Sequence, residues 1–324
     1  MANAETQRPK FELKGIVPII PTPFKEDQEV DWESLRALVD FACASGACAM
    51  CLPAYASEFY KLSEDERRRA ISEAVGRSSG RLPVIGQVNA FSAKHAAETA
   101  LDAQRTGVNA VSVSVPRLIA LGERDIFRYF DRILSAIDVP LIIQDFNPGG
   151  PTISLDFIAN LHRAHPHFRY VKLEEPMMAS KVEAIVQKMS GEVGVLEGWG
   201  GMYMLDLAPA GICGVMPSLG AADILSLVFR LAKQSRMDEA YEAFREVLPW
   251  IVFSLQSLEL LHHVEKSLLA ARGVIKEAFV RDASLELNSH DRQQMVFLNN
   301  KILAALDRLH LARNPGAATG PAAP

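Results

Sequence analysis

The sequence has 324 residues, of which 49% are hydrophobic and 23% charged, and its formal net charge at pH 7 is -5. This balance is typical of a globular protein with a large core, and the absence of a basic excess argues against a nucleic-acid partner. No apolar run is long enough to span a bilayer and the first residues lack the apolar segment of a signal peptide, so we expect a cytoplasmic protein without a membrane partner.

Short apolar runs of β type recur roughly every 30 residues, which is the length of one strand-plus-helix unit. Most of them are continuously apolar rather than alternating, as in parallel strands that are covered on both faces. The runs begin at Gly15, Cys48, Pro83, Ala110, Pro140, Arg169, Val193 and Ile212.

Amphipathic stretches with helix start signals lie between these runs. Asp31 and Ser92 each precede such a stretch, and Ser63 has the spacing of a capping box with Glu66. Gly107 follows the stretch after Ser92, where a left-handed helix terminator is expected. The alternation of strand and helix predicts an α/β protein with a (β/α)8 TIM barrel. An open doubly wound sheet is the alternative, but no GxGxxG segment follows the first strand to favour it.

The chain is longer than a barrel requires. We expect a flexible N-terminal segment at 1–12, the barrel at 13–235, and additional C-terminal helices at 236–312, where apolar periodicity continues. These helices could pack on their own barrel or bury apolar surface against other copies of the chain. The tail at 313–324 is mostly Pro, Gly and Ala and is expected to be disordered.

Cysteine and histidine patterns do not indicate a metal or redox site. Cys48 and Cys51 have CxxC spacing, but they lie in an apolar strand without a second pair, so we expect buried thiols. The histidines within 162–167 are expected in a solvated turn. His262 is expected to pack or lie at the surface of a helix, and Lys266 to be a surface ammonium. No metal or organic cofactor is therefore predicted.

Lys172 lies inside RYVKLEE, in the sixth apolar run. A closed barrel has no edge strand, so this lysine must point into the interior or the active-site mouth, where desolvation favours the neutral amine. A neutral amine is the nucleophile that imine formation with a carbonyl requires. Strand alternation puts Tyr170 and Glu174 on the same face. Glu174 or Glu175 could instead pair with the lysine and keep it charged.

Several segments together resemble the dihydrodipicolinate synthase / N-acetylneuraminate lyase family of class I aldolases and dehydratases, from Gly15 to about Leu309. The matching segments are GIVPIIPTPF in the first strand and its turn, SEFYKLSEDER after the second, YVKLEEP in the sixth, LEGWGG in the seventh and GICGVMPS in the eighth. KLEEP and IIQD, with the pairs Ser57–Glu58 and Glu197–Gly198, are similar to the L-2-keto-3-deoxyarabonate dehydratase group within that family.

The resemblance implies a role for each of these segments in one pocket. Lys172 would form the imine with C2 of a 2-oxo acid, the small-molecule partner that the family binds. The carboxylate of that acid would be held by the backbone amides around Tyr55, Ala56 and Ser57. The further substrate-binding residues that the likeness implies are Glu58, Glu197, Gly198 and Met216. A homo-oligomer, specifically a tetramer, is also implied.

Two departures from the family pattern bear on the chemistry. Tyr55 and Ala56 stand where the family has threonine or serine hydroxyls, so Ser57 would have to supply the side-chain donor. The fifth-strand tyrosine that relays protons is absent, and either Gln144 or Asp145 occupies its place, depending on the end of the strand from which one counts. Neither residue is a phenol, which argues against a dihydrodipicolinate synthase role in lysine synthesis.

The sequence leaves three functions to be compared. An iminium at C2 acidifies C3, and the resulting enamine can expel the C4 hydroxyl, whereas retro-aldol cleavage needs a base at that hydroxyl. Gln144 and Asp145 form a polar pair that could assist a departing hydroxide, with Asp145 as the acid if burial raises its pKa. We therefore expect a lyase that dehydrates a 3-deoxy-2-oxo sugar acid. A pyruvate-dependent aldolase and a non-catalytic 2-oxo acid-binding homologue are the alternatives.

Overall fold

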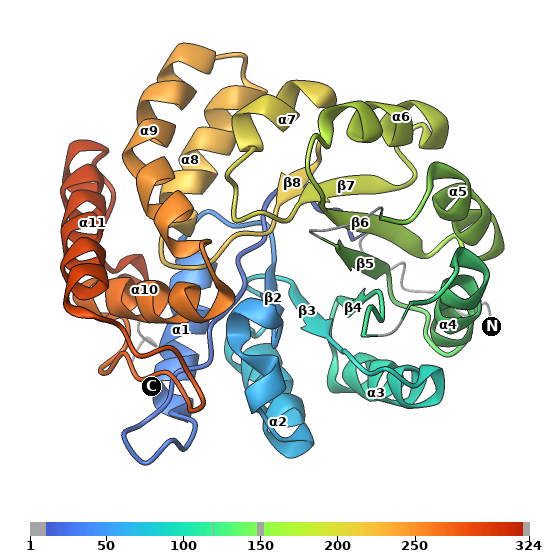
Figure 1. The fold of residues 1–324 in the computed structure, drawn as a ribbon, viewed down its shortest axis with the longest axis horizontal. Coiled ribbons are helices and arrows are strands. Elements are labelled where there is room, and N and C mark those ends of the chain that lie inside the picture. Colours follow the sequence, from blue (N-terminus) through green and yellow to red (C-terminus); the bar gives the residue numbers. More distant parts are fainter. Residues whose placement is uncertain (1–10, 119, 148–151, 320–324) are drawn as a thin grey trace, which may run out of the picture.

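Eight parallel strands form the centre of the computed structural model, which describes residues 11–118, 120–147 and 152–319 (Figure 1). The strands are β1 (Gly15–Ile16), β2 (Met50–Leu52), β3 (Val84–Gln87), β4 (Ala110–Ser114), β5 (Leu141–Phe146), β6 (Phe168–Glu174), β7 (Gly194–Glu197) and β8 (Gly214–Val215). Their order is β1-β8-β7-β6-β5-β4-β3-β2. The remaining seam closes at Cys51, whose carbonyl accepts from the Ile20 N–H and whose N–H donates to the Pro18 carbonyl, both at 3.0 Å. The predicted TIM barrel is therefore confirmed.

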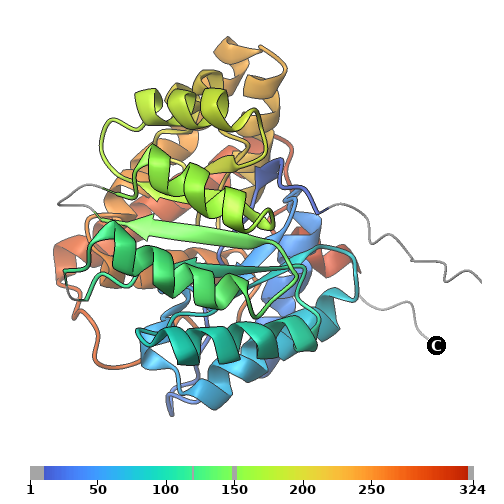
Figure 2. The same cartoon turned by 90° about the vertical axis from the view of Figure 1, so that its right-hand side faces the viewer.

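A helix follows each strand and covers the outside of the barrel. These helices are α1 (Trp32–Ala44), α2 (Glu64–Ser78), α3 (Ala93–Thr106), α4 (Glu123–Leu134), α5 (Leu155–Ala164), α6 (Ala179–Met189), α7 (Met204–Ala210) and α8 (Ala222–Lys233). Figure 2 shows α3 to α6 stacked along one side of the barrel wall. The start signals act as predicted: Asp31 and Ser92 cap α1 and α3, and Ser63 forms the reciprocal capping box with Glu66. Gly107 ends α3 in the left-handed conformation, with φ of 102°.

Strand residues alternate between two separate hydrophobic clusters. Tyr170 packs inside the barrel with Ile142 and Leu196 from its neighbouring strands. Val171 and Leu173 belong to the larger cluster between the sheet and the helices. Alternate residues of a strand share a face, so Lys172 and Glu174 point into the barrel, as Tyr170 does.

Three further helices lie on one side of the barrel, next to α1 and α8 (Figure 1). They are α9 (Met237–Ser254), α10 (Leu258–Ala271) and α11 (Ser289–Arg308). Trp250 of α9 is buried and its indole N–H donates to the side-chain oxygen of Asn299 on α11, at 2.9 Å. Val252 and Leu258 are among the apolar side chains that stay exposed. The additional helices thus pack on their own barrel, and the oligomer stays a prediction.

The C-terminal end differs from its predicted disorder where the structure describes it. Beyond Arg313 the chain forms a 3-10 helix, η3 (Pro315–Thr319), which packs on α1. A Cβ on Gly316 would come within 2.7 Å of the Phe41 backbone nitrogen, so the glycine lets the tail lie directly on that helix. The small residues that predicted disorder here permit close packing instead. Residues 320–324, and residues 1–10 of the predicted flexible N-terminal segment, lie outside the described residues.

Membrane spans were sought among the helices of the described ranges. None of those helices combines the length and the apolar character that crossing a bilayer requires.

Candidate active site

A cavity of about 170 Å³ lies at the carboxyl ends of the barrel strands. Loops that follow β1, β2, β7 and β8 line it, together with the ends of β5 and β6 and the start of α10. Lys172, Glu174 and Gln144 are its polar residues on the inner face of the sheet. The carboxyl ends of the strands are where TIM-barrel enzymes carry their active sites.

Lys172 is paired with a carboxylate inside this cavity. Its Nζ lies 3.1 Å from Glu174 Oε1, and both side chains are less than a tenth exposed. Glu175 turns the other way and binds Lys181 at 3.0 Å. Of the two acidic partners that the sequence left open, Glu174 is therefore the one that faces the lysine. A proton can pass directly between the two groups, which would leave a neutral amine beside a neutral acid.

Gln144 extends the polar group onto the fifth strand. The register of β5 and β6 places it opposite Lys172. Its amide nitrogen donates to Glu174 Oε2 at 3.0 Å, and its amide oxygen accepts from Ser114 Oγ at 3.0 Å and from Gln87 Nε2 at 3.1 Å. On the fifth strand, the residue that faces the cavity in place of the missing tyrosine is thus Gln144. Its amide does not ionise, so it cannot act as an acid or a base.

Asp145 lies on the opposite side of β5 from Gln144, because successive strand residues face opposite ways. Its carboxylate accepts from Arg117 Nη2 at 2.6 Å and from the backbone N–H of Ile153 at 2.5 Å. Burial raises its pKa, against the opposing effect of these two donors. The structure therefore does not bring Asp145 to Lys172, and the predicted acid role has no geometric support.

The loop after β2 contains the short 3-10 helix η1 (Tyr55–Ser57), and it divides the predicted binding residues into two groups. Tyr55 and Ala56 line the cavity, whereas Ser57 and Glu58 do not. Ser57 Oγ donates to the Ile20 carbonyl at 2.5 Å and accepts from the Ala54 N–H at 3.0 Å. This hydroxyl holds the loop in place. Its proton is already donated within the loop, so it is not free to donate to a substrate as expected.

Tyr55 brings a phenol to the cavity from this loop. Its ring contacts Phe59 edge-on, with centroids 5.0 Å apart, and Phe146 of β5 at 6.0 Å. Burial raises the pKa of the phenol, and a hydrogen bond with the Ser114 hydroxyl opposes that rise. The fifth strand has no tyrosine, but the phenol of Tyr55 reaches Ser114 and Glu174 from the loop after β2.

Glu197 and Gly198 shape the wall on the seventh strand. The Glu197 carboxylate accepts from the backbone N–H groups of Trp199 at 3.1 Å and Gly201 at 2.8 Å, and burial raises its pKa to about 7. It thus fixes the turn after β7. A Cβ on Gly198 would overlap the side chain of Glu174, so this glycine leaves the space that the carboxylate occupies. Gly198 and Met216 line the cavity, whereas Glu197 supports its wall from behind.

The predicted surface position of Lys266 is wrong. Its side chain is fully buried, and its Nζ donates to Glu58 Oε1 and, at 2.9 Å, to the Phe279 carbonyl. Glu58 is also buried and binds Lys61 at 3.0 Å. The lysine lies inside because α10 packs on the loop after β2 and a carboxylate there compensates its charge. His262, one turn earlier on α10, is buried as well and bonds the Tyr60 hydroxyl at 3.0 Å.

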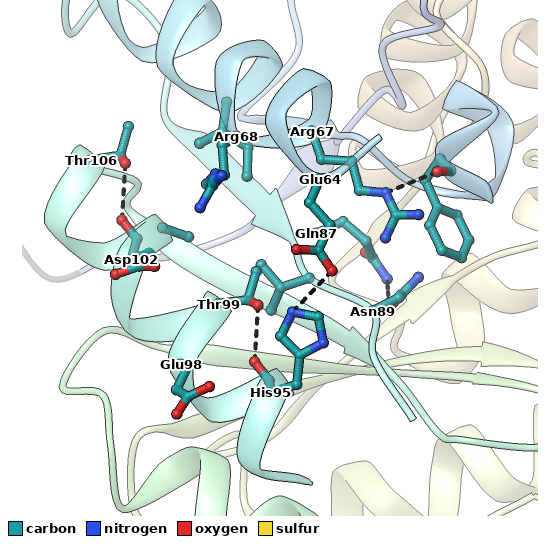
Figure 3. A pocket seen from close by; sticks show the side chains of 14 residues that line it. Glu64, Arg67, Arg68, Gln87, Asn89, His95, Glu98, Thr99, Asp102 and Thr106 are labelled. Carbon is teal, nitrogen blue, oxygen red and sulfur yellow. Dashed lines mark hydrogen bonds and ion pairs between the residues drawn. The ribbon is translucent and has the colours of Figure 1, made fainter. Parts of the chain in front are cut away.

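A second pocket, of about 240 Å³, lies between α2 and α3. Figure 3 shows Glu64 and His95 facing each other across it, 3.3 Å apart, with Gln87 and Asn89 at the end of β3. Lys172 does not line this pocket. Within the described part of the chain, no group of three His, Cys, Asp or Glu side chains is placed to hold a metal ion, and the four cysteines are free thiols.

Comparisons with known proteins agree with this architecture. The chain is 28% identical to an L-2-keto-3-deoxyarabonate dehydratase of Azospirillum brasilense over 296 residues, which cover 89% of this chain and 94% of that protein. Among solved structures it resembles the 4-hydroxy-tetrahydrodipicolinate synthase of Methylacidiphilum fumariolicum, with a TM-score of 0.84, 18% identity and coverage of 92% and 99% of the two chains. A sialic acid aldolase of Ruminococcus gnavus gives a TM-score of 0.84 at 18% identity, over 91% and 99%.

These two structural likenesses show the fold alone, since both identities are low. The family itself is shown by a family-wide sequence match. The model of the dihydrodipicolinate synthetase family matches residues 12–301, nearly the whole described chain. The chain therefore belongs to the dihydrodipicolinate synthetase family, and it is an enzyme of the class I lyase type that this family comprises.

Proposed function

We propose that the protein binds a 2-oxo acid as a Schiff base on Lys172 and dehydrates a 3-deoxy-2-oxo sugar acid resembling 2-keto-3-deoxyarabonate. The observation that carries the proposal is the buried pair of Lys172 and Glu174, 3.1 Å apart in a cavity about 170 Å³ in volume. Such a pair combines a nucleophilic amine with an adjacent group that can take up and return a proton. The dehydratase named above supports this reaction over the others, because it aligns with 89% of this chain.

Imine formation is the first stage. Lys172 transfers its proton to Glu174, and the neutral amine attacks C2 of the substrate, whose carboxylate lies against the backbone amides of Tyr55 and Ala56. The carbinolamine then takes a proton from Glu174 and loses water, which leaves an iminium at C2. The proton transfer between Lys172 and Glu174 spans 3.1 Å, within the distance that general acid–base catalysis requires.

Elimination is the second stage. The Glu174 carboxylate removes a proton from C3, and the electron pair of that C–H bond forms the enamine. The protonated Glu174 then returns the proton to the C4 hydroxyl, which departs as water while the enamine electrons form the C3–C4 double bond. Hydrolysis of the imine frees Lys172 and the dehydrated 2-oxo acid. One carboxyl group can serve as base and acid in turn because the first step gives it the proton that the second step uses.

Retro-aldol cleavage is the second candidate, and Tyr55 is the observation that favours it. A phenol beside Ser114 and Glu174 could remove the proton of the C4 hydroxyl, after which C3–C4 cleavage releases an enamine of pyruvate. A screen of 3-deoxy-2-oxo pentonates and hexonates separates the two reactions, reading pyruvate release against 2-oxo-semialdehyde formation. Pyruvate without a dehydrated product would overturn the dehydratase proposal. A panel without turnover, and reversible pyruvate binding without a borohydride-stable adduct, would support a non-catalytic homologue.

Glu174→Gln is expected to lower kcat by roughly 10²–10⁴-fold, the usual contribution of a general acid–base group. Borohydride reduction with pyruvate should still label Lys172, but more slowly, because the amine remains while the group that accepts its proton is lost. The matched control is Glu175→Gln, which removes the adjacent carboxylate that binds Lys181 and faces away from Lys172. Steady-state kinetics and intact mass measure both effects. Equal losses in the two variants would show that Glu174 has no special part in the chemistry.

The assembly and requirements of the enzyme complete the proposal. We propose a cytoplasmic homotetramer that needs no metal or organic cofactor, because the imine itself withdraws the electrons. Sedimentation of a monomer at micromolar concentration would contradict the tetramer. Loss of activity on chelation, restored by one metal, would contradict the proposal that the enzyme needs no metal.

A further inference from the structure

The amide of Gln144 can face Glu174 in two ways, and the choice affects the protonation of that carboxyl group. With the nitrogen toward Glu174, the amide donates and stabilises the carboxylate. With the oxygen toward Glu174, only a protonated carboxyl group could satisfy it. In the structure Gln144 Nε2 donates to Glu174 Oε2 at 3.0 Å. The reason for this orientation lies on the far side of Gln144, away from the cavity.

On that side a network of hydrogen-bonded side chains begins at a backbone N–H, a group that can only donate. The backbone N–H of Ser114 donates to Asn89 Oδ1 at 2.9 Å. Because a backbone N–H can only donate, Asn89 must present its oxygen at this point. Gln87 Nε2 donates to the same Asn89 oxygen at 3.0 Å, so Gln87 presents its nitrogen to Asn89. That nitrogen also donates to Gln144 Oε1 at 3.1 Å, which turns the nitrogen of Gln144 toward Glu174.

Three of the four side chains in this network are shielded from water, whereas Asn89 is partly exposed and lines the second pocket, so the direction of the network matters most at Gln144. Gln87, Gln144 and Ser114 are all less than a tenth exposed. A reversed amide would bring two oxygens together without solvent to compensate, and buried polar groups without partners are costly. Ser114 Oγ donates to Gln144 Oε1 at 3.0 Å and adds to the same direction.

We propose that Gln87, on β3, is a positioning residue that fixes the amide of Gln144 and thereby holds Glu174 ready as the ionised base. This inference rests on the proposed function for its catalytic meaning. Gln87 does not line the cavity of Lys172; it acts through Gln144 and through Ser114 Oγ, to which its Nε2 also donates at 3.2 Å. Its own oxygen faces Cys51 Sγ at 3.7 Å.

The charged and titratable groups around Glu174 come from three elements. Lys172 faces it on β6 itself, Glu197 from β7, and the Tyr55 phenol from the loop after β2. From β5 the facing group is Gln144, which does not titrate, while Asp145 points away. An uncharged substitution at Gln87 leaves all of these charges in place, so a change in the protonation of Glu174 in that variant comes through the hydrogen bonds that Gln87 makes.

The test is Gln87→Glu. The introduced carboxylate accepts hydrogen bonds where the amide donated them, so Gln144 should turn its nitrogen toward position 87 and its oxygen toward Glu174. The protonation midpoint of Glu174 should then rise by at least about one pH unit, a tenfold change in its protonation equilibrium. The midpoint is read by infrared titration of the carboxyl band, assigned by its loss in Glu174→Gln on each background. Gln293→Glu, at an exposed position of α11, controls for the change in net charge, and an uncharged variant of Gln87 separates the effect of the amide from that of the new local charge.

A second variant guards against a folding defect. Gln87→Leu removes one donor to Gln144 without adding charge, so the Glu174 midpoint should rise by less than in Gln87→Glu. An unchanged midpoint in Gln87→Leu, relative to wild type, would overturn the inference, because a rise in Gln87→Glu alone follows from its added charge.

The acidic limb of the pH profile of kcat/KM tests the proposed function separately. If the Glu174 midpoint moves and the limb moves with it, both proposals are supported. If the midpoint moves and the limb does not, Gln87 positions Glu174 but Glu174 is not the base of the reaction. If wild type turns over no 2-oxo acid, the proposed function fails, and the infrared midpoints still decide the inference.

Discussion

Replacing Lys172 with alanine is expected to abolish turnover of any 2-oxo acid substrate and to remove the borohydride-stable pyruvate adduct. The covalent step has no other amine to use, because Lys172 is the lysine that lines the described cavity. Loss of a covalent nucleophile costs far more than loss of a binding contact, and we expect kcat to fall by more than about 10⁴-fold. Steady-state kinetics and the intact mass after reduction with pyruvate measure the two effects.

Two further variants separate chemistry from folding. Lys172→Arg retains a positive charge beside Glu174 but cannot form an imine, so it should be as inactive as the alanine variant while remaining folded. Lys181→Ala removes the lysine that binds Glu175 outside the cavity and should retain the adduct. An adduct of wild-type yield in Lys172→Ala would mean that another lysine carries the carbonyl chemistry.

The barrel and Lys172 could be predicted because both depend on local patterns. Continuous apolar runs with helix caps between them repeat along the chain, and a lysine within one of those runs has only two directions in which to point. The inward direction follows once the barrel is closed. The structure agrees: Tyr170 packs inside the barrel and Val171 outside, so the position between Val171 and Leu173 faces inward.

The partner of Lys172 needed information that one strand does not contain. Counting along the fifth run left Gln144 and Asp145 equivalent, since either could be the inward residue. The register between β5 and β6 decides the matter by setting Gln144 opposite Lys172. The loop after β2 likewise carries the ring of Tyr55 to Phe146 and its phenol to Ser114, contacts between separate elements that no single strand pattern contains.

Lys266 shows a different limit of sequence reasoning. It lies 208 positions from Glu58 along the chain, and no periodic pattern links the two. A lysine on an amphipathic helix is usually at the surface, so the surface position was the reasonable expectation. Only the packing of α10 on the loop after β2 reveals that the charge is buried and compensated.

This buried pair connects α10 to the substrate loop. Glu58 directly follows η1, with φ of 58°, so its side chain turns away from the cavity and toward α10. The adjacent Glu265 accepts from the Gly220 N–H at 2.7 Å, in the loop after β8. One turn of α10 therefore holds two of the loops around the cavity, and removing a charge from it should affect both stability and substrate binding.

Lys266→Met is expected to destabilise the protein by about 3 kcal/mol, the lower end of the usual cost of leaving a buried charge without its partner. The lower end applies because Lys61 still binds Glu58 at 3.0 Å. Burial lowers the pKa of Lys266 to about 8 even beside Glu58, which indicates that the pair itself adds little net stability. Urea unfolding measures the change, and KM should rise with it because Glu58 no longer anchors the loop that carries Tyr55.

The double variant Glu58→Gln/Lys266→Met gives this prediction its sharpest form. With both charges removed, no buried charge is left alone, so the double variant should be more stable than Lys266→Met even though it carries one substitution more. Its KM should nevertheless stay high, since the ionic anchor of the loop is missing. Additive losses across the two sites would show that Glu58 and Lys266 act independently. A wild-type KM in all the variants would show that the pair stabilises the fold without positioning the substrate loop.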